Sequence, residues 1–379
     1  MLEEYMLSIG YNKDQIKLIE NSYPLSTYTE SSLLFAIKNT INFLHRNTFS
    51  NEDIIYLTTT IPQIIANSIE NIKTKIDVLF NKGISKIDVF QMIKKYPYVI
   101  EMSSQRINNK YIVFEELGFS KNAINNIFIN NPEILNIDPA SIKNCYQYFK
   151  DYGYRQYEIH NIFEVVPVII TYSNKRLDNK FNTFKELGLK KDDIIKTTYY
   201  LPDLFIYSHE EIDDMSKSLE EYGYSKENII NIIKKIPMIL KPYYLDAIMS
   251  KLNNLENLDF TKEDVINITV RNPYILLYSI ENINDNFSNY VDNGFYHKEV
   301  CKMIIDNPIL LGYNKQNINY KFKLFKKLNI LDYIKEHSEV LLISSDIIES
   351  RKDLIKDNCW TDLFISNSKF NKKYNIKEK

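Results

Sequence analysis

Residues 117–135 read LGFSKNAINNIFINNPEIL, and this arrangement recurs along most of the chain. A proline returns every 35 residues, with one interval of 36, and a glycine or a substitute stands fourteen residues before it. A fixed period of this length indicates a repeat array in which each unit packs on its neighbours. The prolines are Pro62, Pro97, Pro132, Pro167, Pro202, Pro237, Pro273 and Pro308. The glycines are Gly83, Gly118, Gly153, Gly188, Gly223 and Gly294, with Thr48 and Asp259 as substitutes.

Each repeat is predicted to contain two helices. Between glycine and proline, apolar residues such as Ile124 and Ile127 recur at the spacing of one helix face. Ser120 suits the start of this first helix and Pro132 ends it. An apolar pair then predicts a tight turn, and a second helix runs from a new cap, Asp138, to the next glycine. We therefore predict an all-α superhelical solenoid of about nine repeats, each with two helices and a 3-10-like turn.

The repeat pattern is interrupted once and fades near the end. One extra residue lies between Pro237 and Asp259, and farther on Asn329 replaces glycine and Ile343 replaces proline. We expect the last residues to be disordered from about Asn367. The predicted boundaries are an array over 1–345, with a capping repeat at about 1–47 and a fading repeat at about 329–345, followed by a capping helix and lysine-rich tail over 346–379.

Composition narrows the function classes. The chain has 379 residues, a net charge of −2 and three cysteines, an odd number typical of free thiols in a reducing compartment. No apolar run approaches the ~20 residues of a membrane helix, so we expect no membrane contact. The acidic start does not resemble a targeting peptide. A complete chain would then be cytoplasmic, whereas one lacking a leader would belong to a mitochondrion or plastid, and we expect a monomer.

No catalytic or metal-binding arrangement emerges from the spacing. Acidic pairs such as Asp192-Asp193 and Glu210-Glu211 fall in the first turns of predicted helices, where the helix dipole favours negative charge. His297 and Cys301 are four residues apart, but two ligands do not make a metal site. Seven of the eight glycines are accounted for as helix ends, which leaves no phosphate loop. We predict a protein that is not an enzyme and holds no cofactor or metal.

The residues Leu117-Gly118-Phe119-Ser120, then Ile124, Ile127, Pro132 and Ile134-Leu135, resemble the repeat of the mitochondrial transcription termination factor (mTERF) family. The resemblance covers about residues 1–345. It implies a helical superhelix that binds double-stranded DNA, or in some members RNA, to control organellar transcription or ribosome assembly. The chain departs from DNA-binding relatives by being slightly acidic. Another 35-residue array, the pentatricopeptide repeat, lacks the fourteen-residue interval from glycine to proline.

One column of residues is a candidate nucleic-acid interface. Thirteen residues past the proline, five of eight repeats carry lysine. One residue per repeat makes a row along a solenoid, and a row of lysines can follow a phosphate backbone. Alternatively, each lysine lays its methylenes on the apolar surface and keeps its charge in water. The candidate residues are Lys75, Lys110, Lys180, Lys251 and Lys321, together with Arg106 and Arg176.

Local charge leaves two partner classes open. Residues 294–328 hold seven Lys/Arg against two Asp/Glu, whereas residues 188–222 hold four against nine and residues 259–293 two against six. A continuous positive stripe would favour nucleic acid. A stripe interrupted by the acidic repeats would favour a protein partner on the same solenoid.

Overall fold

The computed structural model describes residues 1–355 and 360–374. The chain divides into two compact units, the first formed by Met1–Asn182 and Lys191–Ile206 and the second by Thr183–Lys190 and Tyr207–Lys379. Both units are built from helices, and the described residues contain no strand. The predicted all-α repeat fold is therefore confirmed.

The repeats alternate a first helix, a 3-10 turn and a second helix. The first helices are α2 (Lys13–Asn21), α4 (Asn51–Thr60), α6 (Lys86–Lys95), α8 (Lys121–Asn130), α10 (Gln156–Val165), α12 (Lys191–Tyr200), α14 (Lys226–Lys235), α16 (Lys262–Arg271), α18 (His297–Asp306) and α20 (Leu331–Glu336). The second helices are α3 (Glu30–Arg46), α5 (Ile69–Asn81), α7 (Ser104–Glu116), α9 (Pro139–Tyr152), α11 (Asn174–Glu186), α13 (His209–Tyr222), α15 (Leu245–Asn257), α17 (Ile280–Asp292), α19 (Lys315–Leu328) and α21 (Ser345–Arg351). Helix α1 (Leu2–Ile9) precedes them and α22 (Asn367–Lys373) follows.

The 3-10 turns join the two helices of each repeat. They are η1 (Leu25–Thr27), η2 (Pro62–Ala66), η3 (Pro97–Glu101), η4 (Pro132–Asn136), η5 (Pro167–Thr171), η6 (Pro202–Phe205), η7 (Pro237–Leu240), η9 (Pro273–Leu277), η10 (Pro308–Gly312) and η11 (Ser338–Leu342). A further 3-10 turn, η12 (Trp360–Phe364), precedes α22. The extra residue of the 36-residue interval goes with an added turn, η8 (Pro242–Tyr244).

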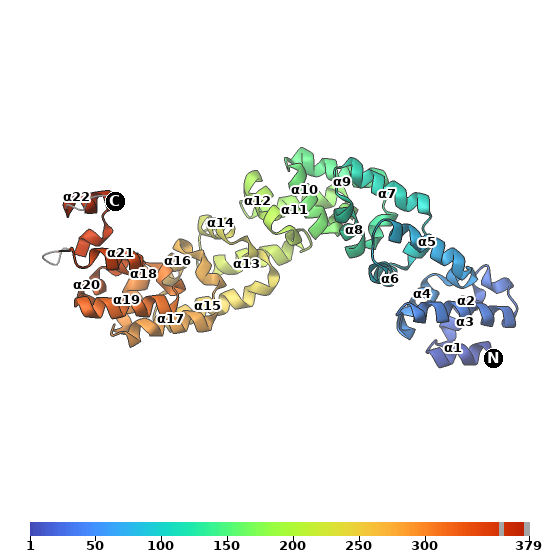
Figure 1. The fold of residues 1–379 in the computed structure, drawn as a ribbon, viewed down its shortest axis with the longest axis horizontal. Coiled ribbons are helices and arrows are strands. Elements are labelled where there is room, and N and C mark those ends of the chain that lie inside the picture. Colours follow the sequence, from blue (N-terminus) through green and yellow to red (C-terminus); the bar gives the residue numbers. More distant parts are fainter. Residues whose placement is uncertain (356–359, 375–379) are drawn as a thin grey trace. The chain divides into compact units, whose positions relative to one another are not determined.

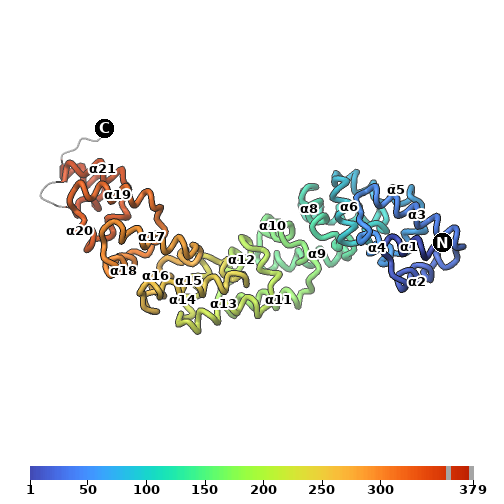
Figure 2. The backbone as a smooth tube through the Cα atoms, turned by 90° about the horizontal axis from the view of Figure 1, so that it is seen from below, coloured from blue at the N-terminus to red at the C-terminus, as the bar shows by residue number. Residues whose placement is uncertain are grey.

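First helices pack on the first helices of the next repeat, and second helices pack on second helices. In the first unit α5, α7 and α9 follow one another along one side, and α6 and α8 along the other (Figure 1). In the second unit α15, α17 and α19 form one layer and α16 and α18 the other. Figure 2 follows the same order of repeats along the chain after a 90° turn. The second helices therefore present one side of each unit as a row of parallel ridges.

The predicted ends of the helices are confirmed. Ser50, Ser85 and Ser120 each accept a hydrogen bond from the backbone N–H three residues on. Ser208 and Glu211 form the reciprocal capping box that the sequence suggests. At the helix ends Gly118 and Gly188 have φ of +86°, and the substitutes Thr48 and Asp259 also have positive φ. These positions need the left-handed conformation that glycine adopts most easily.

The core repeats with the same period. Residues eight, five and four positions before each proline are buried, for example Ile124, Ile127 and Phe128. The apolar pair after the proline, such as Ile134 and Leu135, is buried as well. Because each repeat contributes the same positions, a continuous apolar core forms in each unit.

The C-terminal part corrects two expectations. Turn η11 begins at Ser338, so Ser338 and not Ile343 takes the place of the proline, because α20 has only six residues where most first helices have ten. The expected disorder from Asn367 is wrong for residues 367–373, which form α22. Repeat-like elements therefore continue beyond residue 345, and residues 375–379 lie outside the described residues.

Candidate nucleic-acid interface

The column thirteen residues past the proline lies on the inner flank of the second helices. Lys110, Lys251 and Lys321 are 3%, 8% and 2% exposed. Each ammonium group donates a hydrogen bond to a backbone carbonyl at the 3-10 turn of the following repeat. The acceptors are Ile137 O for Lys110, Leu276 O for Lys251 at 2.7 Å and Leu341 O for Lys321 at 2.6 Å.

Other residue types at this position make the same contact. The thiol of Cys145 donates to Ile169 O at 3.5 Å, and Asn286 Nδ2 donates to Leu311 O at 2.6 Å. Arg351, thirteen residues past Ser338, donates to Asp362 O, Leu363 O and Ile365 O. The column is therefore a row of donors that join one repeat to the next.

Burial lowers the pKa of the three buried ammonium groups in this column. Loss of hydration lowers the pKa of Lys110, Lys251 and Lys321 below the usual lysine value, and nearby Arg106 lowers that of Lys110 further. A buried ammonium group that is bonded to a carbonyl must break that bond to reach an external phosphate. These three ammonium groups therefore do not lie in water, which both interpretations of the column require, and their contact with phosphate stays a prediction.

The remaining candidates are more accessible. Lys75 and Lys180 are half-buried at the same position of α5 and α11. Arg106 is exposed and donates to Asn136 O at 3.2 Å and to the Asn136 side chain. Arg176 is exposed and stacks on Tyr172, with its guanidinium carbon 3.6 Å from the ring centre. Their contact with phosphate stays a prediction.

Grooves lie between successive second helices. One of about 430 Å³ separates α7 from the start of α9 and is lined by Arg106, Asn109 and Lys110 among others. An equivalent groove of about 390 Å³ lies between α17 and α19, where Asn286 and Lys315 contribute. A third, of about 510 Å³, separates α9 from α11 in the first unit. The grooves recur because the second helices repeat with the same spacing.

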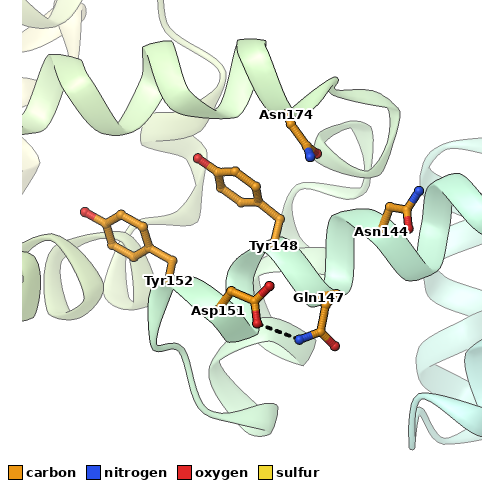
Figure 3. A pocket seen from close by; sticks show the side chains of 6 residues that line it. All are labelled: Asn144, Gln147, Tyr148, Asp151, Tyr152 and Asn174. Carbon is orange, nitrogen blue, oxygen red and sulfur yellow. Dashed lines mark hydrogen bonds between the residues drawn. The ribbon is translucent and has the colours of Figure 1, made fainter.

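The groove beside α9 is lined mainly by uncharged polar side chains. Figure 3 shows Asn144, Gln147, Tyr148, Asp151 and Tyr152 along α9 and Asn174 at the start of α11. Gln147 Nε2 donates to Asp151 Oδ1 at 2.6 Å, and the Tyr148 hydroxyl donates to Asp178. Amides and hydroxyls of this kind can hydrogen-bond the edges of bases or sugars.

The charge of the exposed surface changes from one second helix to the next. We define the outer stripe as the residues eight, twelve, fifteen and nineteen positions past the proline; all of those named here are exposed. In the first unit the stripe is mixed and amide-rich, with Gln105 and Asn109 on α7 and Asn144 and Gln147 on α9. In the second unit α13 and α17 are acidic, whereas α19 is basic. The acidic members are Glu210, Asp214 and Glu221 on α13 and Glu281, Asp285 and Asp292 on α17.

Several of the acidic and histidine side chains singled out in the sequence have local partners in the structure. The Glu211 carboxylate accepts a hydrogen bond from Ser208 N–H at the start of α13, and Asp213 pairs with Lys217 at 2.8 Å. His297 Nε2 and Cys301 Sγ both approach Leu258 O, at 3.1 Å and 3.5 Å, and so contact one helix end. Within the described residues, no three histidine, cysteine or carboxylate side chains are placed to hold a metal ion.

The search for membrane-crossing segments is also limited to the described residues. Among them, no helix combines the length and apolar character needed to cross a bilayer.

A family model matches most of the chain. The family model called mTERF matches residues 3–114, 101–215 and 208–351, and these overlapping segments together run from residue 3 to residue 351. No curated protein gives a significant match.

Proposed function

Because the chain belongs to the mTERF family, we propose that it binds nucleic acid and acts by occupying its target. The family consists of non-enzymatic helical repeats that are known to bind nucleic acid. The observation that carries the proposal is the length of the match, since three segments cover nearly the whole array. Single repeats bury little surface alone, so the binding surface is a property of consecutive repeats.

We place the contact on the side formed by the second helices. Arg106 and Lys110 line one groove there, and Arg176, Lys75 and Lys180 lie on the neighbouring second helices. Cationic side chains supply affinity for phosphates, and the amide-rich stripe of the first unit offers hydrogen bonds to sugars or bases. Since Lys110 is already bonded to Ile137 O, Arg106 is the stronger candidate for phosphate contact in this groove.

The target we propose is duplex DNA or RNA of an organelle, with transcription or ribosome assembly as the regulated process. Members of the family are often organellar, and this supports the compartment. The amide-rich grooves are compatible with either nucleic acid, because hydrogen bonds to 2′-hydroxyls and to base edges use the same donors.

Direct binding tests the proposal. The full chain would be titrated into fluorescent duplex DNA, single-stranded DNA, single-stranded RNA and duplex RNA at low salt, with unlabelled competitors. We expect saturable binding to at least one of the four. Absence of binding to all of them at about 50 mM salt would contradict the proposal, since electrostatic affinity is greatest there.

A protein partner is the second candidate function. The acidic outer stripes of α13 and α17 favour it, because carboxylates repel a phosphate backbone and attract a basic protein. If Asp214→Asn and Glu221→Gln together leave nucleic-acid affinity unchanged, the outer stripe of α13 lies outside the nucleic-acid contact. A rise in affinity would mean that these carboxylates lie close enough to repel the phosphates, and a loss would mean that they accept hydrogen bonds from the nucleic acid.

A further inference from the structure

Helix α19 differs in charge from the other second helices of its unit. It carries five lysines and no carboxylate within Lys315–Leu328. One of them, Lys321, is buried and bonded to Leu341 O, whereas Lys315, Lys323, Lys326 and Lys327 are exposed. Lys323 and Lys327 occupy its outer stripe, the stripe that carries carboxylates on α13 and α17. The basic charge is therefore concentrated on the exposed side of one helix.

The nearby carboxylates already have partners. Glu349 lies 2.5 Å from Lys352 Nζ and accepts a hydrogen bond from the Tyr320 hydroxyl at 3.0 Å. Glu299 lies 3.4 Å from Lys335 Nζ. Among the described residues, no ion pair involves Lys323, Lys326 or Lys327. The three ammonium groups therefore lie on the exposed side of α19 outside any close ion pair of the described residues, and only the charge of Lys327 acts on Glu349, whose pKa it helps to lower.

We propose that Lys323, Lys326 and Lys327 form a phosphate-binding patch, and that it anchors a nucleic-acid backbone at this repeat. The inference rests on the proposed function and specifies where its electrostatic contact lies. The chemistry recognised is a run of phosphodiesters, because a cluster of mobile ammonium groups fits repeated negative charge without reading sequence.

A purely local role accounts for only part of the cluster. Lys326 and Lys327 lie in the last turn of α19, where positive charge favours the helix end. Lys323 lies a turn earlier and gains little from that effect. The position of Lys323 on the outer stripe, beside Lys327, is therefore better explained by contact with an external anion than by interaction with the helix dipole.

The same repeat supplies a matched control. Lys323 and Lys327 are exposed and four residues apart on α19, and Lys298 and Lys302 are exposed and four residues apart on α18. The double variants Lys323→Gln/Lys327→Gln and Lys298→Gln/Lys302→Gln therefore remove equal charge from the two helices of one repeat. Affinity for the best-bound nucleic acid would be measured for both across a salt series, and their melting curves compared with the unaltered chain.

Loss of two phosphate contacts should flatten the log–log salt slope by about 1.8 on duplex DNA, or about 1.4 on a single strand, and lower duplex affinity about 60-fold at 0.1 M salt. We expect this for the α19 variant alone, with unchanged melting. Equal losses in both variants would overturn the inference, because net charge would then explain them. Unchanged binding in the α19 variant would also overturn it while leaving the proposed function intact. Failure of the unaltered chain to bind any nucleic acid would overturn both.

Discussion

The hydroxyl of Tyr154 lies 2.6 Å from Thr198 Oγ1, and both groups are buried between two successive repeats of the first unit. Thr198 donates its own proton to Ile194 O at 2.8 Å, so Tyr154 is the donor in the pair. Tyr154 directly follows Gly153, and Thr198 stands four residues before Pro202. The pair therefore joins the start of one first helix to the end of the next.

The same pairing recurs wherever tyrosine follows the glycine. Tyr11 meets Thr58 at 2.7 Å and Tyr224 meets Thr269 at 2.5 Å. Where phenylalanine follows instead, the partner position is apolar, as with Phe119 stacked on Phe163. A mismatched neighbour would leave a buried hydroxyl without a partner, which costs about 1–3 kcal/mol. These matched pairs favour the native order of repeats.

Thr198→Val should therefore destabilise the chain by about 1–3 kcal/mol, since it keeps the shape but leaves the Tyr154 hydroxyl buried and unpaired. Tyr154→Phe removes the other partner. The double variant should be more stable than the sum of the two single effects predicts, because both polar groups are then gone. Chemical denaturation of the four proteins measures this coupling. Additive losses would show that the two hydroxyls do not interact.

Glycine at the end of the second helix should be needed for two separable reasons. Gly188 has φ +86°, and a Cβ there would lie 2.5 Å from Ile230 Cδ1. Gly294 has φ +105°, with nothing within 4 Å of such a Cβ. We expect Gly294→Ala to cost about 1–2 kcal/mol from the left-handed backbone alone, and Gly188→Ala to cost more. Equal melting temperatures for the two variants would contradict the steric part of this explanation.

The buried Lys321 predicts a pH dependence with a definite sign. Burial lowers its pKa in the folded chain, so between that value and the unfolded value near 10.4 the unfolded chain binds more protons. The contribution of Lys321 to the free energy of unfolding therefore rises with pH through that window. Below the window, the buried ammonium group destabilises the folded chain. The unfolding free energy of the unaltered chain, relative to Lys321→Met, should increase as pH rises towards 10.

Lys323→Met removes an exposed ammonium group from the same helix and corrects for net charge. Subtracting its pH profile should leave the rise in place if it comes from Lys321. A flat difference between the Lys321→Met and Lys323→Met profiles would mean that burial does not perturb this lysine.

Local rules predicted most of the fold. Ser208 and Glu211 could be identified as a capping box from spacing alone, because capping depends on residues within one turn. The position of Ser338 at the start of η11, where other repeats have proline, could not be predicted from the sequence. The shortened first helix α20 shifts the turn without changing the apolar pattern around it. The tyrosine–threonine pairs leave a trace in the sequence, because three tyrosines directly follow a repeat glycine and three threonines stand four residues before the proline of the next repeat. Their contact spans about 45 residues, so no local rule reveals it.

The lysine column shows where sequence reasoning about the site reached its limit. Periodicity gave Lys110, Lys251 and Lys321 the same position within their repeats, and Lys251 keeps that position after the extra residue. Periodicity alone could not reveal that each of these side chains donates a hydrogen bond to a backbone carbonyl at the next 3-10 turn. The exposed lysines of α19 were visible only as a net charge, because the division into buried and exposed members depends on how α19 packs.

The salt dependence of nucleic-acid binding by the unaltered chain tests the central claim most directly. Three phosphate contacts at Lys323, Lys326 and Lys327 predict a log–log slope of about −2.7 on duplex DNA, or about −2.1 on a single strand. Arg106, Arg176, Lys75 and Lys180 would extend the duplex value towards about −6 if all four also bind. A slope within these limits, for whichever nucleic acid binds best, agrees with the account. Affinity that does not change with salt, or no binding at low salt, would contradict it.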